Sequence, residues 1–129
     1  MRKVIFDNET FSLELDADIL IGNIRSEVID LELAQKIVAS RQKYAKGEKF
    51  PQLIKLHSLN KITKEARDFL ASETVREGIL AEAIVVNSVL SNTIVNFVLF
   101  LNPTSFPTKI FNDEEKAREW LRLLVVNKN

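Results

Sequence analysis

The segment over residues 81–101 constrains the fold more than any other part of the sequence. Its first part, residues 83–86, is a short continuous apolar run with β-branched side chains. Such a run is typical of a strand that is buried on both faces of a sheet. Asn87 and Ser88 end the run, and a helix-length apolar segment over residues 89–101 follows directly. A buried strand that leads into a helix is half of a βα unit, so a parallel sheet with helical connections is predicted.

The N-terminal half of the chain supplies further strands and a helix. Alternating apolar and polar residues over 11–15 predict a half-buried strand, and residues 19–24 predict a second strand that forms a hairpin with it. Residues 4–6 are a further candidate for an edge strand. Asp30 is expected to cap a helix that stops near Gly47. Pro51 suits the start of a third strand over residues 52–57, because proline cannot donate to a sheet ladder.

The C-terminal half continues the alternation of strands and helices. Thr63 is expected to cap a helix over residues 64–72, and residues 75–80 are expected to be a frayed extension or a loop. A last strand over residues 108–111 precedes a helix that begins with a capping-box pattern at residues 112–115. On that helix Ala117, Trp120, Leu121 and Leu124 form an apolar stripe, in which we expect Trp120 to be largely buried.

These elements predict one α/β domain over residues 1–129, with an N-terminal hairpin and then parallel βα units. About five strands and four helices are expected. The 18 basic and 18 acidic residues cancel, so the net charge does not favour a nucleic-acid partner. With no cysteine and one histidine, neither a thiolate zinc site nor a pair of histidine ligands is possible. We therefore expect no metal and no cofactor.

Polar residues also bear on where the protein resides. Glu82, Asn87 and five further polar residues interrupt the apolar window over residues 79–101, which favours a soluble core over a membrane span. The apolar run near Met1 has only three residues, which is far too short for a signal peptide. A cytoplasmic protein is expected. The charged residues that follow the first predicted helix are interpreted as its solvated end; they are Arg41, Lys43, Lys46, Glu48 and Lys49.

Four segments carry a resemblance to a known group of proteins: FPQLIK at 50–55, ITKEARDF at 62–69, AEAIVVNS at 81–88 and PTKIFNDEEKAREWL at 107–121. Together with the N-terminal hairpin they resemble the small STAS/SpoIIAA-like proteins of unknown function from Bacteroidetes-type bacteria. The resemblance spans nearly the whole chain and implies a STAS/SpoIIAA-like fold. A wider similarity to anti-sigma factor antagonists rests on element order. In those antagonists a partner kinase phosphorylates a serine after the third strand, but residues 63–66 here lack the Asp-Ser-Ser-Gly pattern.

The search for catalytic motifs finds neither a glycine-rich phosphate loop nor a Gly-x-Ser-x-Gly elbow, and we expect no catalytic residue and no enzyme. His57 and Ser58 lie near the carboxyl end of one predicted parallel strand, while Asn87 and Ser88 end another. Because α/β folds place ligand sites at such strand ends, these four residues are candidates for a binding site. The alternative is that they only tie loops to strand ends by hydrogen bonds.

Two further features each have two interpretations. Thr63 is either a helix cap alone or also a phosphate acceptor at a helix N-terminus. The predicted helix over residues 89–101 has a complete inward apolar face and further apolar residues outside it, namely Val89, Val95, Leu99 and Phe100. Either another copy or a protein partner covers these four residues, or the following loop folds back with Phe106 as a lid.

The sequence therefore predicts a non-enzymatic regulatory or protein-interaction module, with a homodimer or another protein as its partner. The alternative is a small-molecule or lipid-binding domain with a pocket at the carboxyl ends of its strands. A packed interior with a flat apolar patch would favour the first hypothesis, and a lined cavity would favour the second. A titratable group with a perturbed environment in that cavity would be needed for an enzyme.

Overall fold

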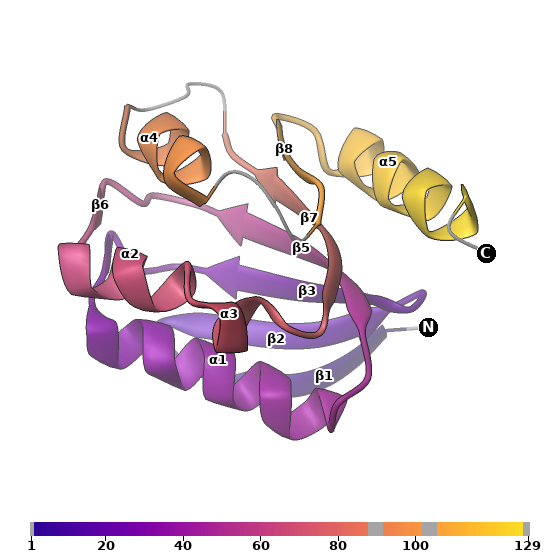
Figure 1. Ribbon diagram of the computed structural model, residues 1–129, viewed down its shortest axis with the longest axis horizontal. Coiled ribbons are helices and arrows are strands. Elements are labelled where there is room, and N and C mark those ends of the chain that lie inside the picture. Colours follow the sequence, from indigo (N-terminus) through magenta and orange to yellow (C-terminus); the bar gives the residue numbers. More distant parts are fainter. Residues whose placement is uncertain (1, 88–91, 102–105, 128–129) are drawn as a thin grey trace.

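The computed structural model describes residues 2–87, 92–101 and 106–127. Within these residues a main sheet has six strands in the order β1-β2-β3-β5-β7-β8 (Figure 1). The first three strands are antiparallel neighbours, and β3, β5, β7 and β8 are parallel. The predicted α/β class, with a hairpin followed by parallel units, is confirmed. The strands are β1 (Arg2–Asp7), β2 (Phe11–Asp16), β3 (Ile19–Ile24), β5 (Phe50–Leu56), β7 (Ile79–Val85) and β8 (Thr108–Phe111).

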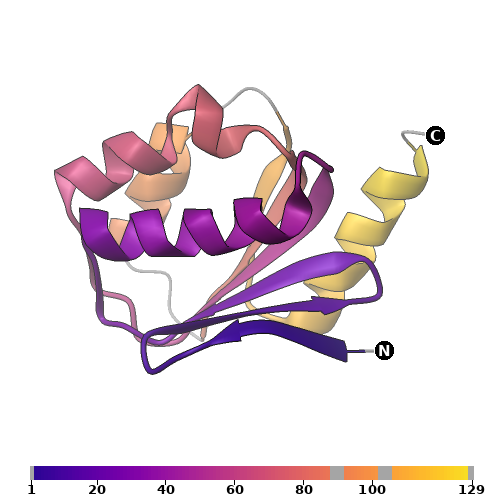
Figure 2. The same ribbon diagram turned by 90° about the horizontal axis from the view of Figure 1, so that it is seen from below.

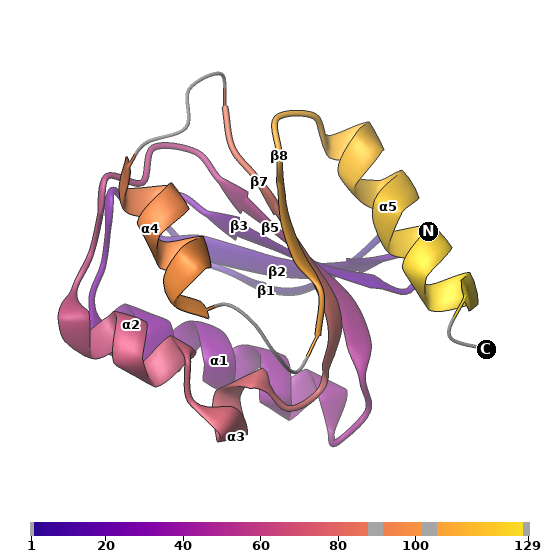
Figure 3. The ribbon, with the colours of Figure 1, turned by 45° about the horizontal axis from the view of Figure 1, so that its top comes forward.

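Helices cover both faces of the main sheet (Figures 2 and 3). One face carries the helices that connect the parallel strands, namely α1 (Leu31–Ala45), α2 (Lys64–Leu70), α3 (Glu73–Arg76) and α4 (Asn92–Leu101). The C-terminal helix α5 (Glu114–Asn127) lies on the other face. A small parallel pair, β4 (Val28–Ile29) with β6 (Lys61–Ile62), lies beside the main sheet. The described residues thus form eight strands and five helices, against about five and four expected.

The alternation of side chains along the central strands divides the interior into two cores. Ile21 on β3, Leu53 on β5 and Ala83 on β7 face α5, where Ala117 and Leu121 are fully buried. Their strand neighbours point to the other face, because successive residues of a strand alternate. That second core contains α1, α2 and α4, and its buried members are Phe11, Ile24, Ile29, Leu33, Ala34, Leu56, Leu59, Ala66, Ile84, Val86 and Ile94.

The predicted helix caps at Asp30 and Thr63 are confirmed. Asp30 Oδ1 accepts a hydrogen bond from the Leu33 amide over 2.9 Å, and Thr63 Oγ1 accepts one from the Ala66 amide over 3.2 Å. At the final helix, Asp113 is the capping residue, and its Oδ1 accepts from the amide of residue 115 over 2.8 Å. Each cap satisfies an amide that has no partner within its helix.

Two sequence expectations were wrong. Residues 75–80 are not a loop, because they contain the end of α3 and the start of β7, which are joined at Gly78 with a left-handed φ of 88°. Arg41 does not belong to a solvated helix end, since it is buried. Trp120, which was expected to be largely buried, packs at the edge of the α5 core: Ala117 and Leu121 occupy the centre of the contact, while the Trp120 ring lies against Phe111 with 5.5 Å between ring centroids.

An ionic network ties the start of α5 to the sheet. Glu114 Oε1 lies 2.8 Å from Lys55 Nζ on β5, and Glu114 Oε2 lies 2.9 Å from Arg118 Nη2. Arg118 in turn reaches Asp16 at the end of β2, with 3.2 Å between Nη2 and Oδ2. The hydrogen bond from Lys55 lowers the pKa of Glu114 despite partial burial, and Arg118 adds to the effect. Burial alone would lower the pKa of Arg118, but its carboxylate partners raise it.

Candidate functional site

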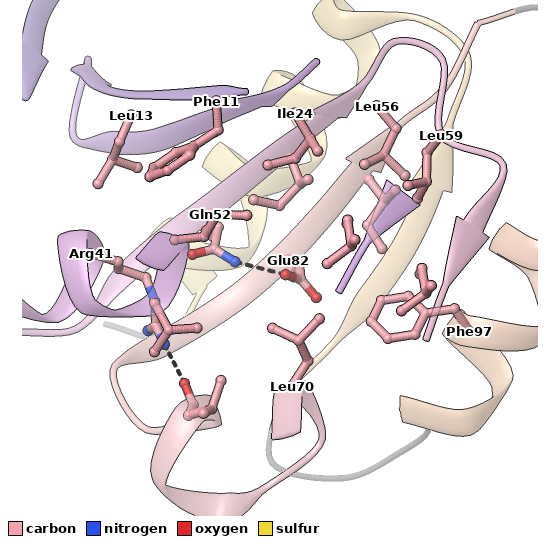
Figure 4. Close-up of a pocket in the computed structure, with 18 of the residues that line it drawn as sticks. Phe11, Leu13, Ile24, Arg41, Gln52, Leu56, Leu59, Leu70, Glu82 and Phe97 are labelled. Carbon is pink, nitrogen blue, oxygen red and sulfur yellow. Dashed lines mark hydrogen bonds between the residues drawn. The ribbon is translucent and has the colours of Figure 1, made fainter. Parts of the chain in front are cut away.

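A cavity of about 100 Å³ lies between the main sheet and the helices of the second core (Figure 4). Most of its wall is apolar and comes from β2, β3, β5, β7, α1, α2 and α4. Leu56, Leu59, Leu70 and Phe97 surround its apolar part, whereas a few polar side chains gather at one end. Ligand sites are commonly lined in this way, by apolar side chains with a small number of polar groups. The polar lining residues are Ser12, Arg41, Gln52, Arg76 and Glu82.

The glycine on β3, Gly22, contributes to this hollow because it has no side chain. Gly22 lies opposite Ile54 in the parallel register of β3 and β5, and both residues line the cavity. A Cβ atom at position 22 would stand 3.0 Å from Ile54 Cδ1, which is closer than ordinary van der Waals contact. Ile54 keeps its position because residue 22 has no side chain there.

Glu82 on β7 is the central polar residue of the cavity. It is the register partner of Gln52 on β5, and Gln52 Nε2 donates a hydrogen bond to Glu82 Oε2 over 2.7 Å (Figure 4). The other oxygen, Oε1, is buried and has no hydrogen-bond partner among the described residues. Burial raises the pKa of Glu82, although Gln52, Arg76 and Arg41 oppose the shift. The carboxyl group therefore tends to hold a proton that a solvated glutamate would lose.

Two buried arginines stand near this carboxyl group. Arg41 on α1 donates to the backbone carbonyls of Val75 and Glu77, the latter over 3.2 Å. Arg76 on α3 stacks on the ring of Phe106, with 4.1 Å between Cζ and the ring centroid. Burial lowers the pKa of both arginines, and the charge of Glu82 opposes this. The cavity thus combines an apolar body with a positively charged end that contains one carboxyl group.

The predicted strand-end residues lie together, but outside this cavity. Asn87 Nδ2 donates to the backbone carbonyl of His57 over 2.8 Å, and His57 Nε2 lies 3.3 Å from Asn23 Oδ1. His57, Ser58 and Asn87 are all exposed, and none of them lines the cavity. The hydrogen bond between Asn87 and His57 fits the interpretation that these residues tie loops to strand ends. Ser88 lies outside the described residues, and a binding role for the four stays a prediction.

The other predicted site residues lie on α2 and α4. Thr63 caps α2 with its hydroxyl group, and its role as a phosphate acceptor stays a prediction. On α4, Val95 is half-buried, while Leu99 is 64% exposed and Phe100 is 42% exposed. The guanidinium carbon of Arg67 lies 4.5 Å from the centroid of the Phe100 ring. Val89 lies outside the described residues.

The proposed lid over this flank occupies another place. Phe106 is buried, and its ring lies under Arg76 of α3 at the polar end of the cavity. The ring of Phe100 instead contacts Arg67, which belongs to α2. Leu99 and Phe100 are both exposed, and residues 102–105 of the loop that was expected to cover them lie outside the described residues.

Sequence reasoning missed the polar residues of the cavity, although a signal for them exists. Every second residue of a strand points to the same face of the sheet, so Glu82 lies on the same face as Ile84 and Val86. A predicted strand that begins before residue 83 would therefore have placed Glu82 among buried side chains. Gln52 similarly lies on the same face as Ile54 and Leu56 on β5. A charged or amide side chain in the buried register of two adjacent strands is the pattern that predicts this site.

Two searches of the described part of the chain give negative results. No group of three or more histidine, cysteine, aspartate or glutamate side chains is placed to hold a metal ion. None of the helices in this part combines the length and the apolar character that crossing a membrane requires.

Comparisons with known proteins bear on the fold. A family described as "Domain of unknown function (DUF7793)" matches residues 13–124. The structure is similar to the crystal structure of an uncharacterized protein from the DUF3478 family with a SpoIIAA-like fold, from Shewanella loihica PV-4. The TM-score is 0.64 with 16% sequence identity, and the match covers 94% of this chain and 95% of the other. The predicted SpoIIAA-like fold is confirmed. A comparison with curated proteins gives no match.

Proposed function

Because the chain belongs to the DUF7793 family, whose function is unknown, we propose its function from the cavity itself: a non-enzymatic module that binds a small, mainly apolar molecule between its sheet and its helices. The sequence favoured a protein-interaction module and kept ligand binding as the alternative. The lined cavity reverses that order. Its position also differs from the expected one, since it lies on the face of the sheet and not beyond the strand ends.

The observation that carries this proposal is an apolar hollow that holds one buried carboxylate oxygen without a partner. Atoms that line an empty space lose dispersion contacts, and a buried polar atom without a hydrogen bond costs free energy. A bound molecule would supply both kinds of contact. Glu82 meets the condition named above for an enzyme, a titratable group in a perturbed environment, so binding without catalysis stays part of the proposal.

Xenon is a suitable first probe, because it enters dry apolar cavities without regard to polar recognition. We expect dissolved xenon to shift the methyl NMR signals of Leu56, Leu59 and Ile84, which line the cavity, and not those of the exposed Leu123. Gly22→Ala should weaken this response, because the new methyl group pushes Ile54 into the hollow. Unchanged lining signals at high xenon pressure would overturn the proposed function.

Self-association through α4 is a second candidate function, supported by a different observation. Leu99 and Phe100 are adjacent apolar residues that remain exposed, and burying each would be worth about 1.5–3 kcal/mol. A second copy of the chain is the proposed occupant of this surface, since two-fold dimers are the commonest closed assemblies. Sedimentation velocity over a range of protein concentrations tests this, and a protein that stays monomeric throughout would contradict it.

A further inference from the structure

Two groups of opposite chemistry at the polar end of the cavity are available to a ligand, a carboxylate oxygen of Glu82 and the guanidinium group of Arg76. Glu82 Oε1 has no partner among the described residues. Arg76 is buried and stacks on Phe106, but no described residue accepts a hydrogen bond from its guanidinium group. Arg41 differs, because two backbone carbonyls use its donors. Among the described charged residues at this end, Arg76 therefore has all of its donors available, and Glu82 has one carboxylate oxygen available.

Glu82 forms no direct ion pair with the two arginines of the cavity. Both Arg41 and Arg76 attract Glu82 electrostatically. In the described part of the chain, however, no nitrogen of either arginine lies within 4.0 Å of a Glu82 carboxylate oxygen. Neither arginine therefore neutralises Glu82 through a direct ion pair, which leaves both kinds of group available to a polar group of a ligand.

The net charge of the polar end determines whether an anionic or a cationic ligand fits there. Arginine stays protonated at all ordinary pH values, so Arg41 and Arg76 together contribute two positive charges. Glu82 supplies at most one negative charge, and it is the single acidic residue among the described lining residues. The polar end is thus net positive whether or not Glu82 is ionised. An amine would add a third cation there, whereas an anion would be complementary.

We propose that the cavity binds a small monocarboxylic acid, with its hydrocarbon body among the apolar side chains and its carboxylate between Arg76 and Glu82. This inference rests on the proposed function and names its ligand class. The ligand carboxylate accepts N–H bonds from Arg76 and an O–H bond from Glu82 in its protonated form, and such charge-assisted bonds are strong. The apolar walls contact the chain of the acid.

The volume of the cavity sets the size of this acid. An engineered cavity of about 150 Å³ holds benzene. The hollow here, at about 100 Å³, is smaller, so the acid has a short chain. Propionate is the probe of choice. Its neutral and cationic counterparts of equal carbon number are 1-propanol and propylammonium.

Isothermal titration calorimetry with these three probes tests the inference on the full chain. We expect propionate to bind at least tenfold more tightly than 1-propanol, and propylammonium to bind more weakly than either. Arg76→Gln should reduce the propionate affinity at least tenfold, and Arg76→Lys should also reduce it because lysine lacks the planar fork. Arg67→Gln is the matched control: Arg67 also stacks on an aromatic ring, but it does not line the cavity, so its loss should leave the affinity unchanged.

The pH dependence of propionate affinity in the Glu82→Gln variant tests whether Glu82 contacts the ligand, because a purely structural role of Glu82 would not change that dependence. The groups that face Glu82 are Arg41 from α1, Gln52 from β5 and Arg76 from α3. As pH rises through the raised pKa of Glu82, propionate stays ionised while Glu82 loses its proton and begins to repel it, so the affinity should fall at least threefold. The Glu82→Gln protein keeps an N–H donor at every pH, and its affinity should stay constant.

The outcomes separate this inference from the proposed function. Equal binding of propionate and 1-propanol would overturn the carboxylate assignment and leave ligand binding intact. Binding of propionate with the same affinity in wild type and Arg76→Gln would also overturn it. Failure of every probe, together with unchanged NMR signals under xenon, would overturn both.

Discussion

Gln52 Nε2 donates to Glu82 Oε2 over 2.7 Å, and the two residues are register partners on the adjacent parallel strands β5 and β7. This bond fixes the carboxyl group within the sheet face. One oxygen is thereby occupied, and the other remains without a partner in the cavity (Figure 4). The strand register therefore decides which oxygen is available to a ligand.

The first prediction concerns pH and Glu82. Its pKa is raised in the folded protein, mainly by burial, so the folded state binds more protons than the unfolded state above the ordinary glutamate value of 4.5. The resulting stabilisation is complete below that pH, and it is lost as pH rises through the raised pKa. A tenfold difference in proton affinity between the folded and unfolded states corresponds to about 1.4 kcal/mol. Urea unfolding at a series of pH values should show that the free energy of unfolding of the wild type falls as pH rises above 4.5. The Glu82→Gln protein should lack this part of the pH dependence.

The exposed Glu65 provides the control for that experiment, since Glu65→Gln removes a carboxyl group that lies outside the cavity. The free energy of unfolding of the Glu65→Gln protein should follow the wild-type pH dependence. If Glu82→Gln also followed it, Glu82 would titrate like a solvated residue.

A second prediction compares two leucines of α5. Leu121 is fully buried against the sheet, whereas Leu123 is 64% exposed. Leu121→Ala should lower the free energy of unfolding by about 2–5 kcal/mol, because it removes buried methyl groups and leaves a void. Leu123→Ala should change it by about 0.5 kcal/mol or less. Similar unfolding midpoints for the two variants would contradict the packing of α5.

The third prediction concerns the network of Glu114. Its pKa is lowered in the folded state, mainly by the hydrogen bond from Lys55, so it stabilises the protein above the ordinary value of 4.5. That contribution is lost as pH falls through the lowered pKa. Glu114→Gln should therefore cost about 0.5–1 kcal/mol at neutral pH, a range that allows for partial exposure.

Glu115→Gln is its matched control, because Glu115 lies in the same first turn of α5 and is exposed. Both variants remove a charge that suits the helix dipole, but only Glu114 bridges Lys55 and Arg118. Chemical unfolding at neutral and at acidic pH should show a difference between the two variants that shrinks in acid. A difference that persists in acid would assign the effect to packing.

A fourth prediction addresses the surface of α4. Leu99→Glu should abolish self-association in sedimentation velocity without lowering the unfolding midpoint, since Leu99 is exposed in the single chain. Leu123→Glu places the same charge at an equally exposed leucine on α5, and it should leave the association unchanged. A Leu99→Glu protein that loses stability instead would show that this residue belongs to the core.

The fold could be predicted from the sequence wherever a local pattern decides the structure. Asp30 and Thr63 cap their helices as expected, because a cap needs only a side-chain oxygen and the amides of the first turn. Residues 11–15 form the strand that their alternation predicts, but this strand is not half-buried, because Ser12 and Glu14 on its polar face are buried as well. The parallel sheet follows from the order of strands and helices, which leaves few connections possible.

The cavity could not be predicted in the same way, because it depends on pairs that are distant in the sequence. Residue 82 interrupts an apolar window, and only its register opposite Gln52 shows that it is buried with a partner. Arg41 lies in a run of charges that is typical of a solvated helix end. Its burial arises because α3 presents the carbonyls of Val75 and Glu77 to it, and residues 75–80 show no such helix by periodicity.

Gly22 has a consequence for how this family can diverge. One methyl group at this position would stand 3.0 Å from Ile54 Cδ1, so this side chain of the cavity wall would have to shift. A single substitution can therefore reshape the cavity from within the sheet. If the proposed ligand binding is correct, the residue found at position 22 should separate the relatives that bind a ligand from those that do not.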